Sequence, residues 1–296
     1  MLVFLNGQFV PEEQALILVS DRGFLLGDGL FETVRVAAGR PFRLAEHLER
    51  LERGADFLKI KLPFTPRELK IFAAQLIERN QTPEAILRLT LTRGPGGRGY
   101  TPEHESKPTL VMTLHTVPGA PASGPARSGQ PSRHAGPVAG APLGWKLITS
   151  SLRIPTSGPL TAFKTTSKVL HVMARAEAVE RGADEALLLN TDCEVAETAS
   201  GNIFWVSDDR ICTVPVGRGI LPGITRAVVL EICRTLGLPV NECVIKPEEL
   251  KNSKGVFVTQ SALGIVPVMM FDGAPVAPSP LVDQIAHAYS KILLRP

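Results

Sequence analysis

The sequence lacks the features that mark a membrane-bound or secreted protein. It has no run of about 18 apolar residues, which is the length that a membrane-spanning helix needs. Glu12 and Glu13 stand where a signal peptide would need an apolar core, and no basic segment precedes them. We therefore expect a cytoplasmic protein without a membrane partner.

Cysteine is scarce and shows no pattern of a disulfide framework or a metal site. None of the four cysteines forms a CxxC pair or has a histidine at ligand spacing; they are Cys193, Cys212, Cys233 and Cys243. The six histidines are isolated, and no HExxH, P-loop or EF-hand pattern occurs. We expect idle thiols in a reducing compartment and no metal.

Charge of one sign is not concentrated anywhere in the chain. The formal net charge is +3, and the Lys and Arg residues are scattered, which argues against nucleic acid as a partner.

The length and the apolar content of the sequence are sufficient for a folded core. Its 296 residues, of which 44% are hydrophobic, can bury a sizeable core in one large domain or two ordinary ones.

Two segments with mixed strand and helix patterns predict an α/β (α+β) fold of two domains. In residues 1–117 the patterns predict a hairpin over 2–9, strands over 30–36, 85–93 and 109–116, and helices over 44–59 and 65–80. In residues 143–296 they predict strands over 185–190, 202–206 and 255–259, and helices over 169–181, 225–236 and 280–294. Residues 118–142 hold six Pro and five Gly without periodicity, which indicates an interdomain connection.

A glycine-rich segment, GPGGRG at 94–99, matches the GxGxxG dinucleotide pattern and follows a strand. The residues after it, from Tyr100 onward, do not read as a helix. No helix N-terminus would therefore await a pyrophosphate. We interpret the glycines as a flexible loop that presents Arg98 and Tyr100.

The segment ILPGITR at 220–226 suits a phosphate better. Gly223 ends a loop, and a helix with an apolar stripe begins at Thr225. Free backbone N–H groups and the helix dipole at that start could hold an anion. The simpler explanation is that Thr225 only caps the helix.

Three charged residues are candidates for chemistry, each with a simpler alternative. Lys164, in an uncharged segment before a helix, could serve as nucleophile and base, or be a solvated lysine. Glu197, before an apolar strand, would be a half-buried carboxylate that needs a cation, or a hairpin-end residue bonded to backbone. Arg50 lies about 100° from the apolar stripe of its helix. It could hold a phosphate, or pair with Glu46 on a solvated face.

Together these residues resemble the class IV, or fold-type IV, pyridoxal 5′-phosphate (PLP) enzymes. That family includes branched-chain and D-amino acid aminotransferases and 4-amino-4-deoxychorismate lyases. The likeness runs from DRGFLLGDGLFET at 21–33 to Val266–Val268, and only residues 118–142 lack a counterpart. It implies a small α/β domain, a larger barrel-like α/β domain that binds PLP, a homodimer, and a small substrate with an amine and a carboxylate.

The resemblance assigns roles by position. Lys164 matches the lysine that holds the cofactor, and Glu197 matches the acid at the pyridine nitrogen. Arg50, Ile224, Thr225 and Ser261 match residues at the phosphate. Arg98 matches an arginine used for substrate carboxylates, with Phe31, Tyr100 and Ala262 beside the substrate. Arg153 and Asn202 are assigned to positions near Glu197 that do not contact the cofactor themselves.

Within the family, three features favour the lyases. The segment RGPGGRGY at 93–100 is close to a lyase stretch, Gly264 stands where aminotransferases carry Glu, and Thr198 departs from their Glu-Gly pattern. Ser167 and Ser261 replace an Asn and so depart from the lyases. We expect a lyase that forms 4-aminobenzoate and pyruvate from 4-amino-4-deoxychorismate for folate synthesis. The alternatives are an aminotransferase for D-amino or branched-chain amino acids, and a PLP-binding protein without turnover.

Overall fold

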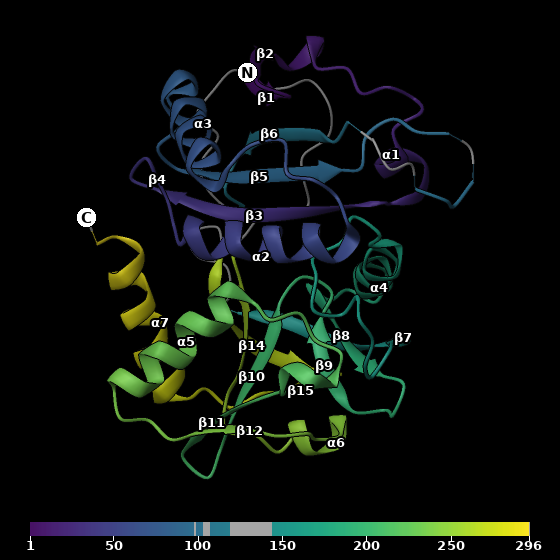
Figure 1. The fold of residues 1–296 in the computed structure, drawn as a ribbon. Helices are drawn as coiled ribbons and strands as arrows, with labels where there is room; N and C mark the ends of the chain where they lie inside the picture. The colour runs from purple at the N-terminus through teal and green to yellow at the C-terminus, as the bar shows by residue number, and fades with distance from the viewer. Residues whose placement is uncertain (98, 103–106, 119–143, 296) are drawn as a thin grey trace. The chain divides into compact units, whose positions relative to one another are not determined.

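The computed structural model describes residues 1–97, 99–102, 107–118 and 144–295. Most of the Pro/Gly-rich stretch, and Arg98, lie outside these residues. The chain divides into two compact units, Met1–Val117 with Phe163–Lys168, and Pro118–Ala162 with Val169–Pro296 (Figure 1). The short segment Phe163–Lys168, which the sequence-based boundaries place in the larger domain, therefore makes its contacts in the first unit.

The first unit is an antiparallel sheet covered by two helices. The strand order is β2-β1-β6-β5-β3-β4. The strands are β1 (Leu2–Leu5), β2 (Gln8–Pro11), β3 (Gly29–Ala37), β4 (Arg40–Pro41), β5 (Ala85–Thr92) and β6 (Thr109–His115). Helix α2 (Leu44–Leu58) runs along β3, and α3 (Pro66–Asn80) packs on β1 and β6 (Figure 1). A 3-10 turn, η1 (Glu12–Gln14), and the short helix α1 (Arg22–Leu26) complete this unit.

Local sequence explains these elements well. Asn6 and Gly7 both take positive φ at the tip of the first hairpin, as the Asn-Gly turn predicts. Thr65 and Glu68 form a capping box at the start of α3, with Pro66 in its first turn. The apolar stripe of α2 joins α3 and the sheet in one core, which includes Leu48, Leu51, Leu69, Leu76, Leu87, Leu89 and Leu91.

The second unit contains a barrel-like sheet. Strands β10, β13, β14, β7, β8 and β9 follow one another in that order, and β9 pairs back onto β10 between Glu197 and Asn202. Six strands therefore close on themselves, and β11, β12 and β15 extend the sheet. The bounds are β7 (Trp145–Ile154), β8 (Glu185–Asn190), β9 (Val195–Thr198), β10 (Asn202–Ser207), β11 (Arg210–Thr213), β12 (Val240–Glu242), β13 (Val256–Gln260), β14 (Gly264–Phe271) and β15 (Ala274–Pro275).

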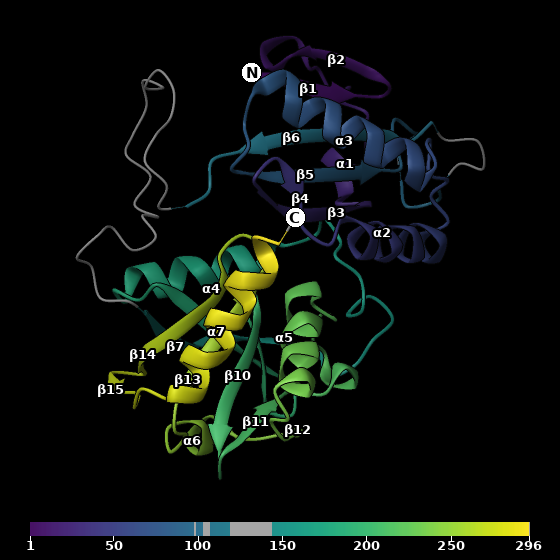
Figure 2. The ribbon, with the colours of Figure 1, turned by 90° about the vertical axis from the view of Figure 1, so that its left-hand side faces the viewer.

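Helices cover this sheet. Helix α4 (Val169–Glu180) packs against β7 and β8. Helices α5 (Ile224–Thr235) and α7 (Pro280–Leu293) lie side by side and contact β13 and β14 respectively (Figure 2). A 3-10 turn, η2 (Val216–Arg218), precedes α5, and α6 (Pro247–Leu250) precedes β13.

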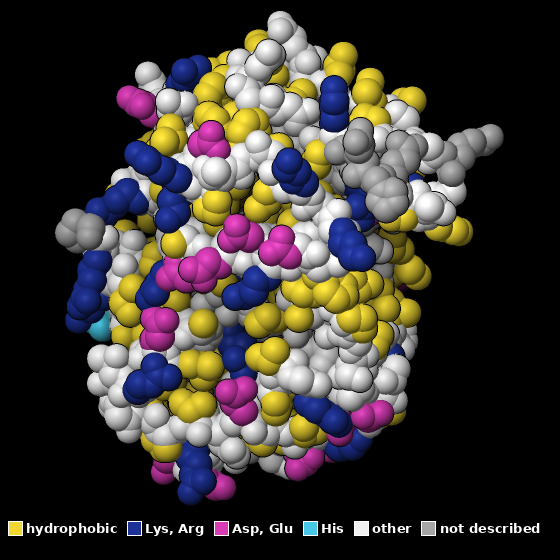
Figure 3. Space-filling view, viewed as in Figure 1, with side chains coloured by type: hydrophobic (Ala, Val, Ile, Leu, Met, Phe, Trp, Pro, Cys, Tyr) yellow, Lys and Arg dark blue, Asp and Glu magenta, His cyan; other side chains and the backbone are white. Residues whose placement is uncertain are grey.

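The described surface carries mixed charge. On the face in Figure 3, basic and acidic side chains are interspersed, with apolar side chains between them. In the first unit, the segment before and within α1 exposes large apolar side chains: Leu16, Ile17, Leu18, Val19, Phe24, Leu25 and Leu26. No helix of the described residues is long and apolar enough to cross a membrane.

Candidate functional site

Lys164 is held against the start of β3 by backbone pairing. The Phe31 N–H donates to the Lys164 carbonyl at 2.9 Å, and the Thr166 N–H donates to the Gly29 carbonyl at 2.9 Å. The Lys164 ammonium lies 4.6 Å from the centre of the Phe31 ring. Lys164 and Lys168 are both half-buried, so exposure does not separate them. The Lys164 amine lies beside Phe31, the ring that the family resemblance assigns to the substrate, and this favours Lys164 as the candidate.

Arg88 is a further candidate residue that the sequence reasoning did not include. Its guanidinium carbon lies 4.0 Å from the centre of the same Phe31 ring, so one ring carries both cations. Burial lowers the pKa of the Arg88 guanidinium, and no carboxylate among the described residues pairs with it. The signal was an arginine inside the apolar strand AILRLTLT. A half-buried guanidinium without an acidic partner can bind an anionic group of a ligand.

Arg50 is buried, only 4% exposed, and is paired with Glu32 of β3. Its Nε donates to Glu32 Oε1 at 2.8 Å and its Nη2 to Oε2 at 2.7 Å, a bidentate pair. His47 Nδ1 lies 2.7 Å from the same Oε2. The alternative of a solvated pair with Glu46 is wrong, because Glu46 pairs with Arg43. Glu32 occupies one edge of the guanidinium, so a phosphate would have to meet another edge.

Replacing Glu32 by Gln should destabilise the protein by about 3–5 kcal/mol, since it leaves the Arg50 charge buried without compensation. Burial alone would raise the pKa of the Glu32 carboxyl, but the hydrogen bonds and charges of Arg50 and His47 hold it to about 2. A lowered pKa stabilises the folded state above the ordinary pKa of the group, and this contribution is lost as pH falls toward 2.

Urea unfolding of wild type and Glu32→Gln at a series of pH values measures the contribution of Glu32 to the free energy of unfolding. We expect the difference in unfolding free energy to be full at neutral pH and to shrink below the ordinary Glu pKa of 4.5. The matched control is Glu46→Gln in the exposed pair, which should cost about 1 kcal/mol or less. A difference that stays constant down to acid pH would contradict an ionised Glu32.

Glu197 sits at the seam where β9 meets β10. Its Oε2 accepts a hydrogen bond from the Leu221 N–H at 3.0 Å and from Asn202 Nδ2 at 3.4 Å. Asn202 Nδ2 also donates to the Leu221 carbonyl at 2.9 Å. At Oε1 the described residues offer only His171 Nε2, 3.7 Å away. The hydrogen bond between Glu197 and the backbone, which the simpler explanation expects, is therefore present, but it engages only Oε2. Oε1 can still accept a hydrogen bond from the ring N–H of a cofactor.

The start of α5 is a candidate site for an anion. Gly223 is the N-cap and no side chain caps the helix, so the alternative of Thr225 as a mere cap is wrong. Thr225 is buried in the first turn, and the first N–H groups of a helix have no acceptor within it. A Cβ atom added to Gly223 would lie 2.1 Å from Asn202 Oδ1, so a side chain at this position would force Asn202 to move. The N–H groups of Ile224 and Thr225 and the helix dipole suit a phosphate.

The remaining predicted residues have less support from geometry. Ser261 and Ala262 are half-buried in the turn between β13 and β14. Arg153 donates to the carbonyls of Ser150 and Leu152, and no described contact joins it to Glu197. The Tyr100 side chain is 88% exposed. Arg98 lies outside the described residues, so its role stays a prediction.

Each unit by itself offers groups that match a part of PLP. In the first unit, the Lys164 amine matches the aldehyde of that cofactor. In the second unit, the Glu197 carboxylate, with only His171 Nε2 at 3.7 Å from its Oε1 among the described residues, matches the pyridine N–H, and the uncapped start of α5 matches the phosphate.

Comparison with known proteins gives the same family. The family model "Amino-transferase class IV" matches residues 29–270. A D-alanine aminotransferase from Bacillus licheniformis is 31% identical over 99% of this chain and 98% of its own length. A candidate branched-chain-amino-acid aminotransferase from Methanocaldococcus jannaschii is 34% identical over 92% of this chain and 88% of its own length.

A solved structure extends the match to the fold. A candidate 4-amino-4-deoxychorismate lyase from Legionella pneumophila superposes with a TM-score of 0.81 at 26% identity, covering 95% of this chain and 97% of that one. The small sheet unit and the barrel-like unit are those of fold-type IV, as the sequence predicts. This chain belongs to the class IV aminotransferase family and is a PLP-dependent enzyme.

Proposed function

We propose that the protein is an aminotransferase that moves an amino group between an amino acid and a 2-oxo acid. The observation that carries this is the Phe31 ring with its two cations, Lys164 at 4.6 Å and Arg88 at 4.0 Å. An amino acid presents an amine and a carboxylate, which suits a lysine-bound aldehyde and a guanidinium that both contact one ring. The named aminotransferases among the relatives support this alternative better than the lyase that the sequence favoured.

The residues divide the work as follows. PLP, when bound, accepts the electron pair that the amino acid releases as it loses a proton. Lys164 holds the cofactor and then moves that proton as a general base and acid. Glu197 keeps a proton on the pyridine nitrogen through Oε1, and Asn202 and the Leu221 N–H fix the carboxylate through Oε2. Ile224, Thr225, Ser261 and Arg50 hold the phosphate, while Arg98 and Arg88 bind carboxylates.

The homodimer and the cytoplasmic location belong to this proposal. The exposed apolar side chains of residues 16–19 and 24–26 support a second copy of the chain as the partner, because contiguous apolar surface usually marks an interface.

The test is a single-turnover assay without a 2-oxo acid. D-Alanine, L-leucine and D-phenylalanine are each added to the holoenzyme, and loss of the visible cofactor band is followed together with formation of the oxo acid. We expect conversion with at least one of them. Steady-state turnover with a 2-oxo acid added then gives the KM of that substrate, which should rise about tenfold in Arg88→Met, as for loss of one charged hydrogen-bonding partner.

The control for Arg88 is Arg67→Met, an exposed arginine on α3, which should leave KM unchanged. A parallel incubation with 4-amino-4-deoxychorismate measures 4-aminobenzoate. Release of 4-aminobenzoate without conversion by any amino acid would overturn the aminotransferase and restore the lyase.

A further inference from the structure

The segment that carries Lys164, Phe163–Lys168, belongs to no helix or strand of the first unit. It pairs with the start of β3 at a single β-bridge, between Thr165 and Leu30. A lysine side chain is long and flexible, so the place of its amine depends on how firmly the backbone beneath it is held. The contacts of this short segment therefore decide where the Lys164 amine can reach.

An aromatic stack holds the segment just before Lys164. The centre of the Phe163 ring lies 4.7 Å from that of Phe57 on α2, with 29° between the ring planes. Phe163 also packs against the apolar core of the first unit. Stacked ring pairs favour one mutual arrangement over others. The residue before the lysine is thus fixed to α2.

Thr166 holds the segment just after Lys164. Its Oγ1 donates a hydrogen bond to the Gly27 carbonyl at 2.8 Å, and its N–H donates to the Gly29 carbonyl at 2.9 Å. A hydroxyl has one proton to donate, and the branched threonine side chain has few rotamers, so this bond fixes the residue in one orientation. One half-buried residue thus ties the lysine segment to two glycines at the start of β3.

The two glycines permit this close approach. Gly27 has a φ of 67°, and a Cβ atom there would lie 3.2 Å from Ser167 Cβ. A Cβ atom on Gly29 would lie 2.6 Å from the Leu91 carbonyl oxygen and 3.3 Å from Thr166 Oγ1. The left-handed conformation at Gly27 also favours a residue without a side chain. The backbone at these glycines therefore forms a close-fitting support for the lysine segment.

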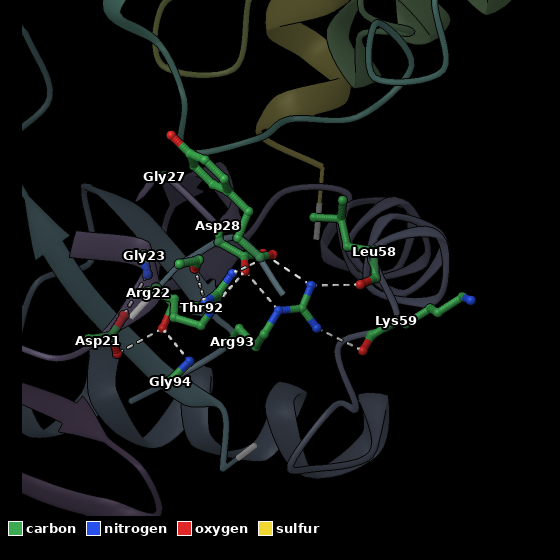
Figure 4. Close-up of polar contacts among 12 residues, drawn as sticks. Asp21, Arg22, Gly23, Gly27, Asp28, Leu58, Lys59, Thr92, Arg93 and Gly94 are labelled. Carbon is green, nitrogen blue, oxygen red and sulfur yellow. Dashed lines mark hydrogen bonds and ion pairs between the residues drawn. The ribbon is translucent and has the colours of Figure 1, made fainter. Parts of the chain in front are cut away.

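Asp28, between the two glycines, fixes this support (Figure 4). Its Oδ2 accepts hydrogen bonds from Arg22 Nε at 3.0 Å and from Arg93 Nε at 2.7 Å, and its Oδ1 accepts from Arg93 Nη2 at 3.1 Å. The Arg93 N–H also donates to the Asp28 carbonyl at 3.1 Å. Arg22 is 3% exposed and Arg93 is 6% exposed. Two buried guanidinium groups that depend on one carboxylate are costly to separate from it, so the support is rigid.

We propose that Thr166 is a positioning residue for the Lys164 amine: through Gly27 and Gly29 it fixes the lysine segment to the support that Asp28 holds. This rests on the proposed function, in which Lys164 moves the proton. A small displacement of a reacting group lowers the rate of the chemical step, whereas binding of the substrate depends on groups outside this segment. Loss of the Thr166 hydroxyl should therefore lower kcat and leave KM almost unchanged.

The kinetic test compares Thr166→Val and Thr166→Ser with wild-type holoenzyme, in steady-state turnover of the amino acid with a 2-oxo acid added. Valine keeps the branched shape but lacks the hydroxyl, and serine keeps the hydroxyl but lacks the methyl group. We expect kcat to fall about tenfold in Thr166→Val, with KM within about threefold of wild type. In Thr166→Ser both constants should stay within about threefold, because the bond to Gly27 can still form.

The second readout is amide hydrogen exchange, measured on the apoprotein and therefore independent of activity. Exchange of the peptide that contains residues 163–168 should be at least about tenfold faster in Thr166→Val than in wild type, because local opening of this segment costs less without the hydroxyl. In Thr166→Ser it should return to within about threefold of wild type. Recovery with serine would assign the effect to the hydroxyl rather than to packing of the methyl group.

Thr161→Val is the matched control. Thr161 Oγ1 donates to the Gly158 carbonyl at 2.8 Å, so the same substitution removes a hydroxyl-to-carbonyl bond of the same length, three residues before Lys164. It should leave kcat, KM and exchange of residues 163–168 within about twofold of wild type, as for a surface substitution away from the support.

Gly27→Ala tests the support from its own side, with the Thr166 hydroxyl still present. The added Cβ atom would press on Ser167, and alanine is strained at a φ of 67°. We expect the same pattern as in Thr166→Val, with a lower kcat, an almost unchanged KM and faster exchange of residues 163–168. Melting temperatures of all variants show that they are folded under the assay conditions.

The outcomes separate the two proposals. Faster exchange and a lower kcat in Thr166→Val, both restored in Thr166→Ser, support the inference. Unchanged exchange in Thr166→Val overturns it, whatever the activity, and so does an unchanged kcat in an enzyme whose wild type converts amino acids. Equal losses in the valine and serine variants also overturn it, because the hydroxyl would then not be the cause. Wild-type protein that converts none of the amino acids contradicts the proposed function instead, while the exchange data still decide whether Thr166 fixes the lysine segment.

Discussion

Lys164→Ala should abolish the visible absorption of the cofactor and lower turnover at least about 10³-fold, because one amine both holds the cofactor and moves the proton. The side chain lies over the Phe31 ring, and its backbone pairs with β3. Alanine leaves that pairing intact, so the fold should remain. A spectrum from 300 to 500 nm with added PLP and a single-turnover assay measure the two effects.

The matched control is Lys168→Ala, four residues later and equally half-buried. It should keep the band and turn over within about threefold of wild type, as expected for a substitution away from the reacting atoms. If Lys168→Ala loses the band and Lys164→Ala keeps it, the assignment of the lysine is wrong.

Glu197→Gln should lower turnover at least about 10²-fold while PLP still binds, since a neutral amide no longer favours the protonated pyridine ring. The amide oxygen can still accept the Leu221 N–H, now 3.0 Å from Oε2. The loss would therefore come from charge rather than from the seam between β9 and β10. Turnover and cofactor dissociation are measured on the same preparation.

Glu194→Gln is the control for Glu197. Glu194 lies just before β9 and pairs with Arg218 and Asn190 rather than with the seam. Its substitution should leave turnover within about twofold, as for a pair at the surface. Normal turnover in Glu197→Gln would refute a role for this carboxylate at the ring nitrogen.

Elements with strong local signals could be predicted from the sequence. The hairpin at Asn6-Gly7, the apolar stripe of α2 and the capping box at Thr65 are all encoded within a few residues. The family resemblance implied a barrel-like domain, but the local sequence patterns did not predict how the barrel closes. The closure depends on β9, four residues long, and on the pairing of Glu197 with Asn202, which only the folded sheet brings together. Strand β14 was missed because it contains Pro267 and begins at Gly264 with positive φ.

The site shows the same division. Lys164, Glu197 and Thr225 could be proposed because they stand in short motifs that resemble a family. The partner of Arg50 was mispredicted because sequence spacing offers Glu46 at i−4, whereas Glu32 lies on a neighbouring strand 18 residues away. Arg88 was not among the predicted residues. Its local signal, an arginine inside an apolar strand, does not indicate a ligand, and its place beside the Phe31 ring is seen only in the fold.

The central claim is that Lys164 holds the cofactor, and borohydride reduction tests it most directly. Wild-type holoenzyme is reduced, digested with trypsin and mapped by mass spectrometry. Trypsin does not cut at a modified lysine, so an adduct on Lys164 should appear on the peptide 154–168, uncleaved after Lys164. An adduct on the peptide 165–175, uncleaved after Lys168, or on any other lysine, would contradict the account.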